Sequence, residues 1–183
     1  MRHTPRLTLT VSAMLAVSAA AAGCSSAGAT QAKARFGTET FVLATTSAAV
    51  NPDYGLRASG LFAGAGTMPG IGSGENSSVA RLPGGTFIVS HPASDEKVTS
   101  QSVNPHTCVA VLRQSGTYSI GHGTGTFAGM TGYGTDTGTI TARLPRHAGG
   151  SCDTSTSARP VAGSVHAVIT MTGRVLIPPR TAA

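Results

Sequence analysis

The sequence predicts an all-β domain, built either as a sandwich of two sheets or as a closed antiparallel barrel. Glycine supplies 24 of the 183 residues, well above the usual level of about 7 %. Side chains in the C-terminal half alternate between apolar and polar, which is the period of a strand with one buried face. After Cys24 no window shows the 3.6-residue period of an amphipathic helix.

The chain begins with the three parts of a secretory leader. Arg2 and Arg6 form a positive segment, Leu7 to Ala22 is mostly apolar, and small residues then lead into Cys24. The apolar stretch of about 16 residues is short for a membrane-spanning helix, which needs about 20. We therefore expect residues 1–23 to be a signal peptide and not an uncleaved membrane helix.

The AAGC sequence of residues 21–24 resembles the lipobox of bacterial lipoproteins, although Ala21 stands where leucine is commonest. The resemblance implies that the Cys24 thiol is lipidated and that Cys24 becomes the mature N-terminus. Residues 24–35 are rich in small and polar residues and predict a flexible linker. We expect the protein on the outer face of the cytoplasmic membrane, with the membrane as its partner through the lipid anchor. Ordinary secretion, with cleavage after the AGA sequence of residues 27–29, is the alternative.

The other two cysteines form an even pair outside the cytoplasm. Cys108 and Cys152 are expected to form a disulfide in an oxidising compartment. That bond would close a loop of about 45 residues, for which the chain-entropy model gives about 4 kcal/mol. The alternative is a free, nucleophilic Cys108 beside His106. No C-x-x-C spacing is present, so no metal site and no cofactor are expected.

The strands are placed by apolar runs and by turn residues. The Pro83-Gly84-Gly85 turn joins two short strands, and Pro178-Pro179 ends the last one. A polar loop is expected at 147–160, and the barrel domain is expected to cover residues 36–178, with a loose tail at 179–183. The expected strands are Phe36 to Thr46, Gly55 to Gly66 (broken by glycine), Val79 to Leu82, Thr86 to His91, Asp95 to Val103 (weak), Cys108 to Ile120, Gly138 to Leu144 and Gly163 to Ile177.

Alternation assigns the faces of the later strands. The expected buried face carries Cys108, Ala110, Leu112, Tyr118 and Ile120, then Ile140, Ala142 and Leu144, and finally Val165, Ala167, Ile169, Met171 and Val175.

The segment from Gly116 to Gly134 contains a Gly-Thr-Gly-Thr-aromatic-x-Gly-x-Thr-Gly stretch. It resembles the allene oxide cyclase and dirigent-like barrel proteins, above all a group of uncharacterised secreted actinobacterial proteins. The resemblance implies a single closed antiparallel β-barrel of about eight strands, with Phe127 as a plug and an apolar interior that could hold a small lipophilic molecule. It also implies that certain glycines serve the turn, through positive φ or close backbone approach, namely Gly121, Gly123, Gly125, Gly129 and Gly132.

Few residues are candidates for chemistry. Glu39 shares a face with Phe41 and Leu43, so a raised pKa could make it an acid or base, although a place on the wet rim at the strand start is the favoured interpretation. His91 shares a face with Phe87 but precedes Pro92, which predicts a strand end. The other histidines are expected in solvent or in loops without a paired carboxylate: His106, His122, His147 and His166.

Charge argues against nucleic acid as a partner. The formal net charge is +6, and it falls to about +4 without the two arginines of the leader. The basic residues form no dense stripe of the kind that nucleic-acid binding needs.

The expected function is that of a non-enzymatic binding or structural module, with an apolar small molecule as the candidate ligand. The alternative is an isomerase or cyclase that acts on a lipophilic substrate inside the barrel, with Glu39 as its first candidate residue.

Overall fold

The computed structural model describes residues 33–45, 53–70 and 76–179. The predicted signal peptide at 1–23, Cys24 and most of the predicted linker lie outside these residues. The described part is all-β and has a single 3-10 turn, at Gly125–Phe127. Its nine strands are β1 (Arg35–Thr45), β2 (Tyr54–Gly60), β3 (Gly64–Met68), β4 (Ser77–Leu82), β5 (Gly85–Ser90), β6 (Lys97–Val103), β7 (Val109–Gly121), β8 (Thr131–Arg143) and β9 (His166–Ile177).

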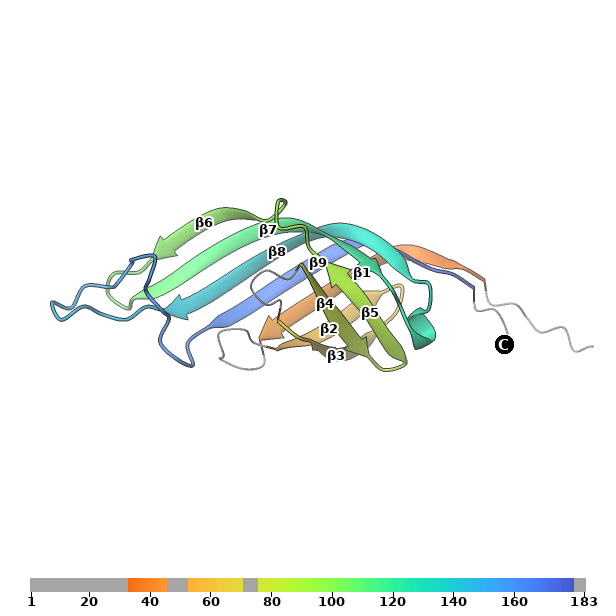
Figure 1. Ribbon diagram of the computed structural model, residues 1–183, viewed down its shortest axis with the longest axis horizontal. Helices are drawn as coiled ribbons and strands as arrows, with labels where there is room; N and C mark the ends of the chain where they lie inside the picture. The colour runs from red at the N-terminus through yellow and green to blue at the C-terminus, as the bar shows by residue number, and fades with distance from the viewer. Residues whose placement is uncertain (1–32, 46–52, 71–75, 180–183) are drawn as a thin grey trace, which may run out of the picture. The chain divides into compact units, whose positions relative to one another are not determined.

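Eight of the strands close into an antiparallel barrel (Figure 1). The order runs from β5 through β4, β3, β2, β1, β9 and β8 to β7, and β5 then pairs with the end of β7, from Ile88 opposite Gly121 to Ser90 opposite Ser119. The sequence left a sandwich open as the alternative, and the structure confirms the barrel. Closure removes the unpaired strand edges that would otherwise invite aggregation.

The ninth strand, β6, lies outside the barrel. It pairs with the first half of β7, from Lys97 opposite Ser115 to Val103 opposite Ala110. Here β6, β7, β8 and β9 continue past the barrel as an open sheet (Figure 1). Ala110 and Leu112, predicted on the buried face, are only half-buried, because this part of the sheet has no barrel wall opposite it.

Several predicted strand boundaries were wrong, and the strand predicted from Gly163 begins only at His166. The stretch from Gly55 to Gly66 forms two strands, because Gly60 adopts a positive φ of 131° and turns the chain. The strand predicted from Gly138 begins at Thr131, because Gly134 lets the backbone of β8 lie close against Thr172 on β9. Arg35, assigned to the linker, is the first residue of β1.

The two-residue alternation correctly identifies the barrel interior. Tyr118, Met171 and Val175 are buried, whereas Thr117, Thr172 and Arg174 are exposed. Burial of such apolar side chains supplies most of the stability of a domain of this size. The buried core comprises Phe41, Leu43, Leu56, Ala58, Met68, Ala80, Leu82, Phe87, Val89, Tyr118, Ile120, Phe127, Met130, Met171, Val175 and Ile177.

The glycine-rich segment is a hairpin, as predicted. It joins β7 to β8, and Gly125 has a φ of 56° in the left-handed region that suits glycine. A Cβ on Gly123 would overlap the carbonyl oxygen of Phe127. Gly121 differs from the expectation: its φ is not positive and nothing lies within 4 Å of a Cβ placed there.

Among the described residues, no helix has the length and apolar character that crossing a membrane requires.

Candidate functional site

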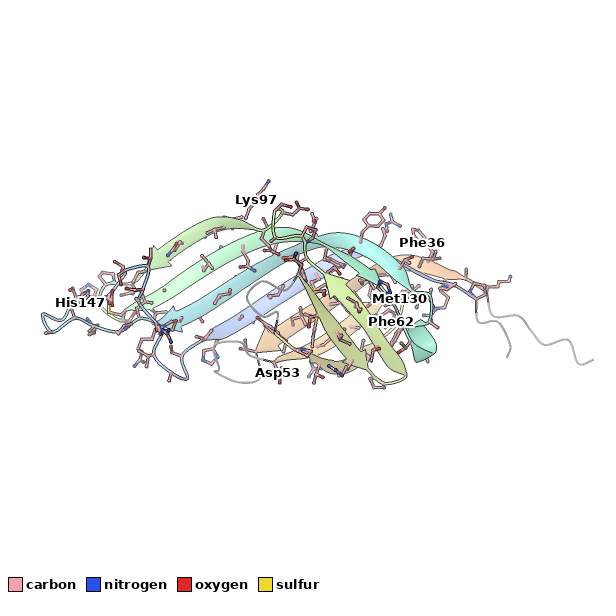
Figure 2. All side chains as sticks on the ribbon, viewed as in Figure 1. Phe36, Asp53, Phe62, Lys97, Met130 and His147 are labelled. Atoms are coloured by element: carbon pink, nitrogen blue, oxygen red, sulfur yellow. A yellow bond between two sulfur atoms is a disulfide. The ribbon has the colours of Figure 1, made fainter. Side chains whose placement is uncertain are left out.

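One end of the barrel is filled by aromatic rings. Phe127 packs edge-on against Phe87, with ring centroids 5.5 Å apart, and lies 5.1 Å from Phe62. Phe41 continues the cluster at 5.6 Å from Phe87. Phe62 and Met130 lie at this end in Figure 2. Phe127 is thus the plug that the resemblance implied.

Deeper in the barrel, one row of paired residues crosses four strands. Tyr118 on β7 lies opposite Gly134 on β8, which pairs with Gly173 on β9, which pairs with Glu39 on β1. The two glycines leave room for the ring of Tyr118, whose hydroxyl would be 2.7 Å from a Cβ on Gly173. Tyr118 therefore extends along the row toward Glu39.

Glu39 is fully buried, with 0 % of its surface exposed. The expectation of a wet-rim position was wrong, because inward alternation begins at Glu39 itself: Thr38 is exposed, whereas Glu39, Phe41 and Leu43 are buried. Its Oε2 accepts a hydrogen bond of 3.0 Å from the backbone N–H of Phe62, and its Oε1 has no hydrogen-bond partner. Burial raises the pKa of the Glu39 carboxyl, against the lowering effect of backbone hydrogen bonds.

Tyr118 connects this row to the open end of the barrel. Burial, and then the negative charges of Glu39 and Asp136, raise the pKa of Tyr118 to about 12. Its ring centroid lies 6.3 Å from that of His91. Its hydroxyl has no hydrogen-bond partner.

A polar cluster, which we call the mouth triad, lies at the open end and consists of His91, Glu96 and Asp136. His91 Nδ1 is 3.5 Å from Asp136 Oδ2 and 3.7 Å from Glu96 Oε1. His91 directly follows β5, Glu96 directly precedes β6, and Asp136 belongs to β8. The strand pairing thus brings together residues from three separate segments.

The mouth triad is largely shielded from solvent. Only 1 % of the Asp136 side chain and 11 % of the His91 side chain are exposed, against 32 % for Glu96. Burial and the charge of Asp136 raise the pKa of the Glu96 carboxyl, and His91 opposes that rise. His91 Nδ1 and Asp136 Oδ2 have no hydrogen-bond partner.

The mouth triad lines a cleft of about 320 Å³. An apolar wall, formed by Leu43, Met68 and Ile169, belongs to the same cleft. Ligand sites combine such an apolar lining with a few placed polar groups, and their volumes start at about 300 Å³. The remaining lining residues are Tyr54, Asn76, Ala93 and Gln114.

The sequence located only part of this site. His91 does occupy the predicted strand end. It is two residues after Val89 and four after Phe87, which both face inward, so its ring also points inward and lines the cleft. Asp136 was missed, although it lies on the same face of β8 as Ile140 and Ala142, which were predicted to be buried and are half-buried. Extending that alternation back through Gly138 would have found it. No periodic signal points to Glu96, because its loop precedes an exposed strand.

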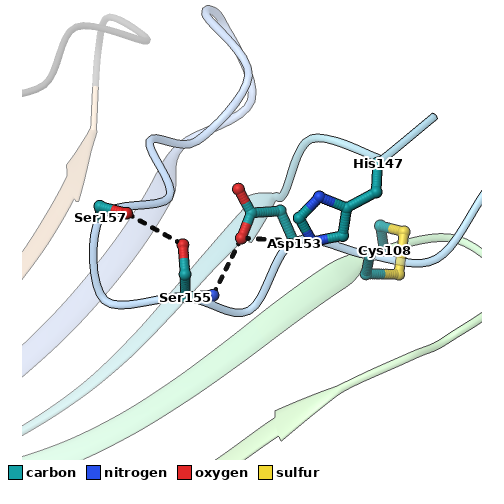
Figure 3. Close-up of polar contacts among 6 residues, drawn as sticks. Cys108, His147, Asp153, Ser155 and Ser157 are labelled. Atoms are coloured by element: carbon teal, nitrogen blue, oxygen red, sulfur yellow. Dashed lines mark hydrogen bonds and ion pairs between the residues drawn. A yellow bond between two sulfur atoms is a disulfide. The ribbon is translucent and has the colours of Figure 1, made fainter.

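The other predicted residues lie elsewhere. Cys108 and Cys152 form the predicted disulfide, with Cα atoms 5.4 Å apart, so Cys108 is not a free nucleophile. His106, His122 and His166 are exposed, as expected. The expectation that His147 lacks a carboxylate was wrong: its Nε2 lies 3.7 Å from Asp153 Oδ1, in the loop shown in Figure 3.

Comparison of the chain with models of protein families, with curated proteins and with solved structures gave no match. The functional conclusion therefore depends on the chemistry of the cleft.

Proposed function

We propose that the protein is an exported lipoprotein whose barrel is a non-enzymatic module that binds a small, largely apolar molecule in the cleft. The observation that carries the proposal is the lining of the cleft, in which an apolar wall faces His91 and Asp136. Both residues carry buried polar atoms without a hydrogen-bond partner. Buried polar groups are rarely left unpaired, so a ligand with a polar end would satisfy them.

The ligand is expected to place its apolar body against Leu43, Met68 and Ile169. Its polar end would be a hydrogen-bond donor or a cation, because Asp136 and Glu96 are acidic and the cleft is lined by no lysine or arginine among the described residues. Burial of the apolar body supplies affinity, and the polar contacts supply orientation.

An isomerase or cyclase is the second candidate. Glu39, with its raised pKa and unpartnered Oε1, is the observation in its favour. Glu39 does not line the cleft, however. The side chain of Tyr118 extends from β7 toward Glu39, over the two glycines that lie between them. A ligand in the cleft would meet the mouth triad and not Glu39, which favours the binding role.

Export is supported by the disulfide. Disulfides such as Cys108–Cys152 persist mainly outside the cytoplasm. The proposal retains Cys24 as the lipidated residue, the outer face of the cytoplasmic membrane as the location, and kinship with the secreted allene oxide cyclase/dirigent-like barrels, whose implied eight-stranded architecture this chain has.

Native mass spectrometry of the protein purified from its own membrane tests the ligand proposal. The wild-type protein should retain a small molecule. Ile169→Trp should lose it, because Ile169 lines the cleft and packs against the core. Val168→Trp is the matched control, since Val168 is the adjacent residue but is 50 % exposed on the outer face.

Retention by wild type and Val168→Trp, with loss in Ile169→Trp, supports a ligand in the cleft. Absence of any adduct from the wild-type protein, or an equal adduct in Ile169→Trp, would overturn the proposal.

A further inference from the structure

The mouth triad has the composition of a metal site. It offers one imidazole nitrogen and two carboxylate oxygens, and these three atoms all lie within 4.8 Å of one another. Mixed nitrogen and oxygen donors of this kind suit Zn²⁺ and related divalent transition ions, whereas Mg²⁺ and Ca²⁺ prefer all-oxygen sites. No metal site was expected from the sequence, in which Glu96 and Asp136 stand 40 positions apart (136 minus 96).

The spacing fits one ion. Two donors of a tetrahedral Zn²⁺, each bound at about 2.0–2.2 Å, lie roughly 3.3–3.6 Å apart. His91 Nδ1 is 3.5 Å from Asp136 Oδ2 and 3.7 Å from Glu96 Oε1. The third pair, Glu96 Oε1 and Asp136 Oδ2, lies within 4.8 Å. An ion bound by all three atoms would therefore draw in Glu96, which lies on the rim and is the freest of the three to move.

Gly116 makes room for the two carboxylates. It pairs with Asp136 across β7 and β8. A Cβ at this position would lie 2.7 Å from Glu96 Oε1 and 3.1 Å from Asp136 Oδ2. Glycine thus lets both oxygens approach the same point above the strand.

An independent observation indicates that the triad is incomplete without a ligand. Asp136 Oδ2 and His91 Nδ1 are buried and have no hydrogen-bond partner. A buried carboxylate is costly unless it is paired or coordinates a metal. His91 Nδ1 and Asp136 Oδ2 lie within ion-pair distance, at 3.5 Å, but the contact is too long for a good hydrogen bond, so it offsets that cost only in part.

We propose that His91, Glu96 and Asp136 bind one divalent transition-metal ion of the Zn²⁺ class at the mouth of the barrel. Three protein donors leave a coordination position open, and the triad lines the cleft, so that position faces the space beside Leu43 and Ile169. The ion would bind the same His91 and Asp136 atoms that the polar end of the small molecule would contact, so the two ligands would take that point in place of each other. The metal site depends only on the three side chains and not on the identity of the small molecule.

Isothermal titration with ZnCl₂ tests the site. The purified full chain, without a histidine tag and stripped with EDTA, should bind one Zn²⁺. His91→Gln and Glu96→Gln should each weaken binding by more than about tenfold. Glu96→Gln keeps the test independent of folding, because Glu96 lies on the rim with 32 % of its side chain exposed.

His147→Gln is the matched control. His147 also faces a carboxylate at 3.7 Å, but its side chain is 58 % exposed and the pair lies in a surface loop. It should leave Zn²⁺ affinity unchanged. The proposal is overturned if the wild-type protein takes up no Zn²⁺ at millimolar concentration, if binding survives both triad variants, or if His147→Gln abolishes it. No small molecule enters this titration, so its failure would not bear on the adduct experiment.

Discussion

The hydroxyl of Tyr118 lies directly over Gly173, two strands away, where a Cβ would be 2.7 Å from it. The pairing of Tyr118 with Gly134, and of Gly134 with Gly173, shows how this contact arises. The two glycines on β8 and β9 form a flat floor for the ring. The ring of Tyr118 therefore fits inside the barrel because Gly134 and Gly173 carry no side chains.

Gly173→Ala should reduce the free energy of unfolding. The added methyl would meet the Tyr118 hydroxyl and would overlap the carbonyl oxygen of Tyr133, so we expect an overpacking cost of about 1–3 kcal/mol, measured by urea denaturation. Gly121→Ala is the control, because nothing lies within 4 Å of its Cβ position, and its change should stay within about 0.5 kcal/mol. Equal effects of the two substitutions would contradict the proposed floor.

Glu39→Gln should make the protein more stable at neutral pH and should flatten its pH dependence. Burial raises the pKa of Glu39 above its ordinary value of 4.5. Between 4.5 and that raised value the folded state binds more protons than the unfolded state, so wild-type stability falls as pH rises through this window. The glutamine amide oxygen can still accept from the Phe62 N–H, but it carries no charge.

Denaturation midpoints of wild type and Glu39→Gln, measured from pH 4 to pH 8, test this expectation. The two curves should converge at the acid end and diverge as pH rises. A wild-type protein that gains stability relative to the variant with rising pH would show that the Glu39 pKa is lowered and not raised.

Replacing both Cys108 and Cys152 by serine should lower the free energy of unfolding by about 2–4 kcal/mol. The bond joins residues 44 positions apart and therefore restricts a long loop in the unfolded chain. Guanidinium denaturation of the double variant, compared with wild type before and after reduction, measures the effect. Reduced wild type should match the variant, and a loss below about 0.5 kcal/mol would contradict the chain-entropy argument.

Cys24→Ala should release the protein from the membrane fraction. Without the thiol no lipid can be attached, and among the described residues no helix is long and apolar enough to cross a membrane. Fractionation, together with the mass of the mature N-terminal peptide, measures the result. A wild-type N-terminus that follows Ala29 would instead establish ordinary secretion.

The sequence by itself determined the fold class and much of the interior. Period-two alternation depends only on the geometry of a strand, so Tyr118, Met171 and Val175 could be assigned to the core without knowing which strands pair. Turn residues identified the Pro83-Gly84-Gly85 turn, and the resemblance implied the glycine-rich turn after β7. The disulfide was also predictable, because two cysteines remained for one bond.

Only the tertiary structure decided whether the sheet closes into a barrel, how deeply Glu39 is buried, and that the residues of the mouth triad lie together. Whether Glu39 lies on the rim or inside depends on where the neighbouring strands begin, and that register is set by pairing with β2 and β9. The mouth triad depends on β5 returning to β7, which brings the end of one hairpin beside the middle of β8. Such long-range pairing is a property of the closed sheet, and no local sequence period encodes it.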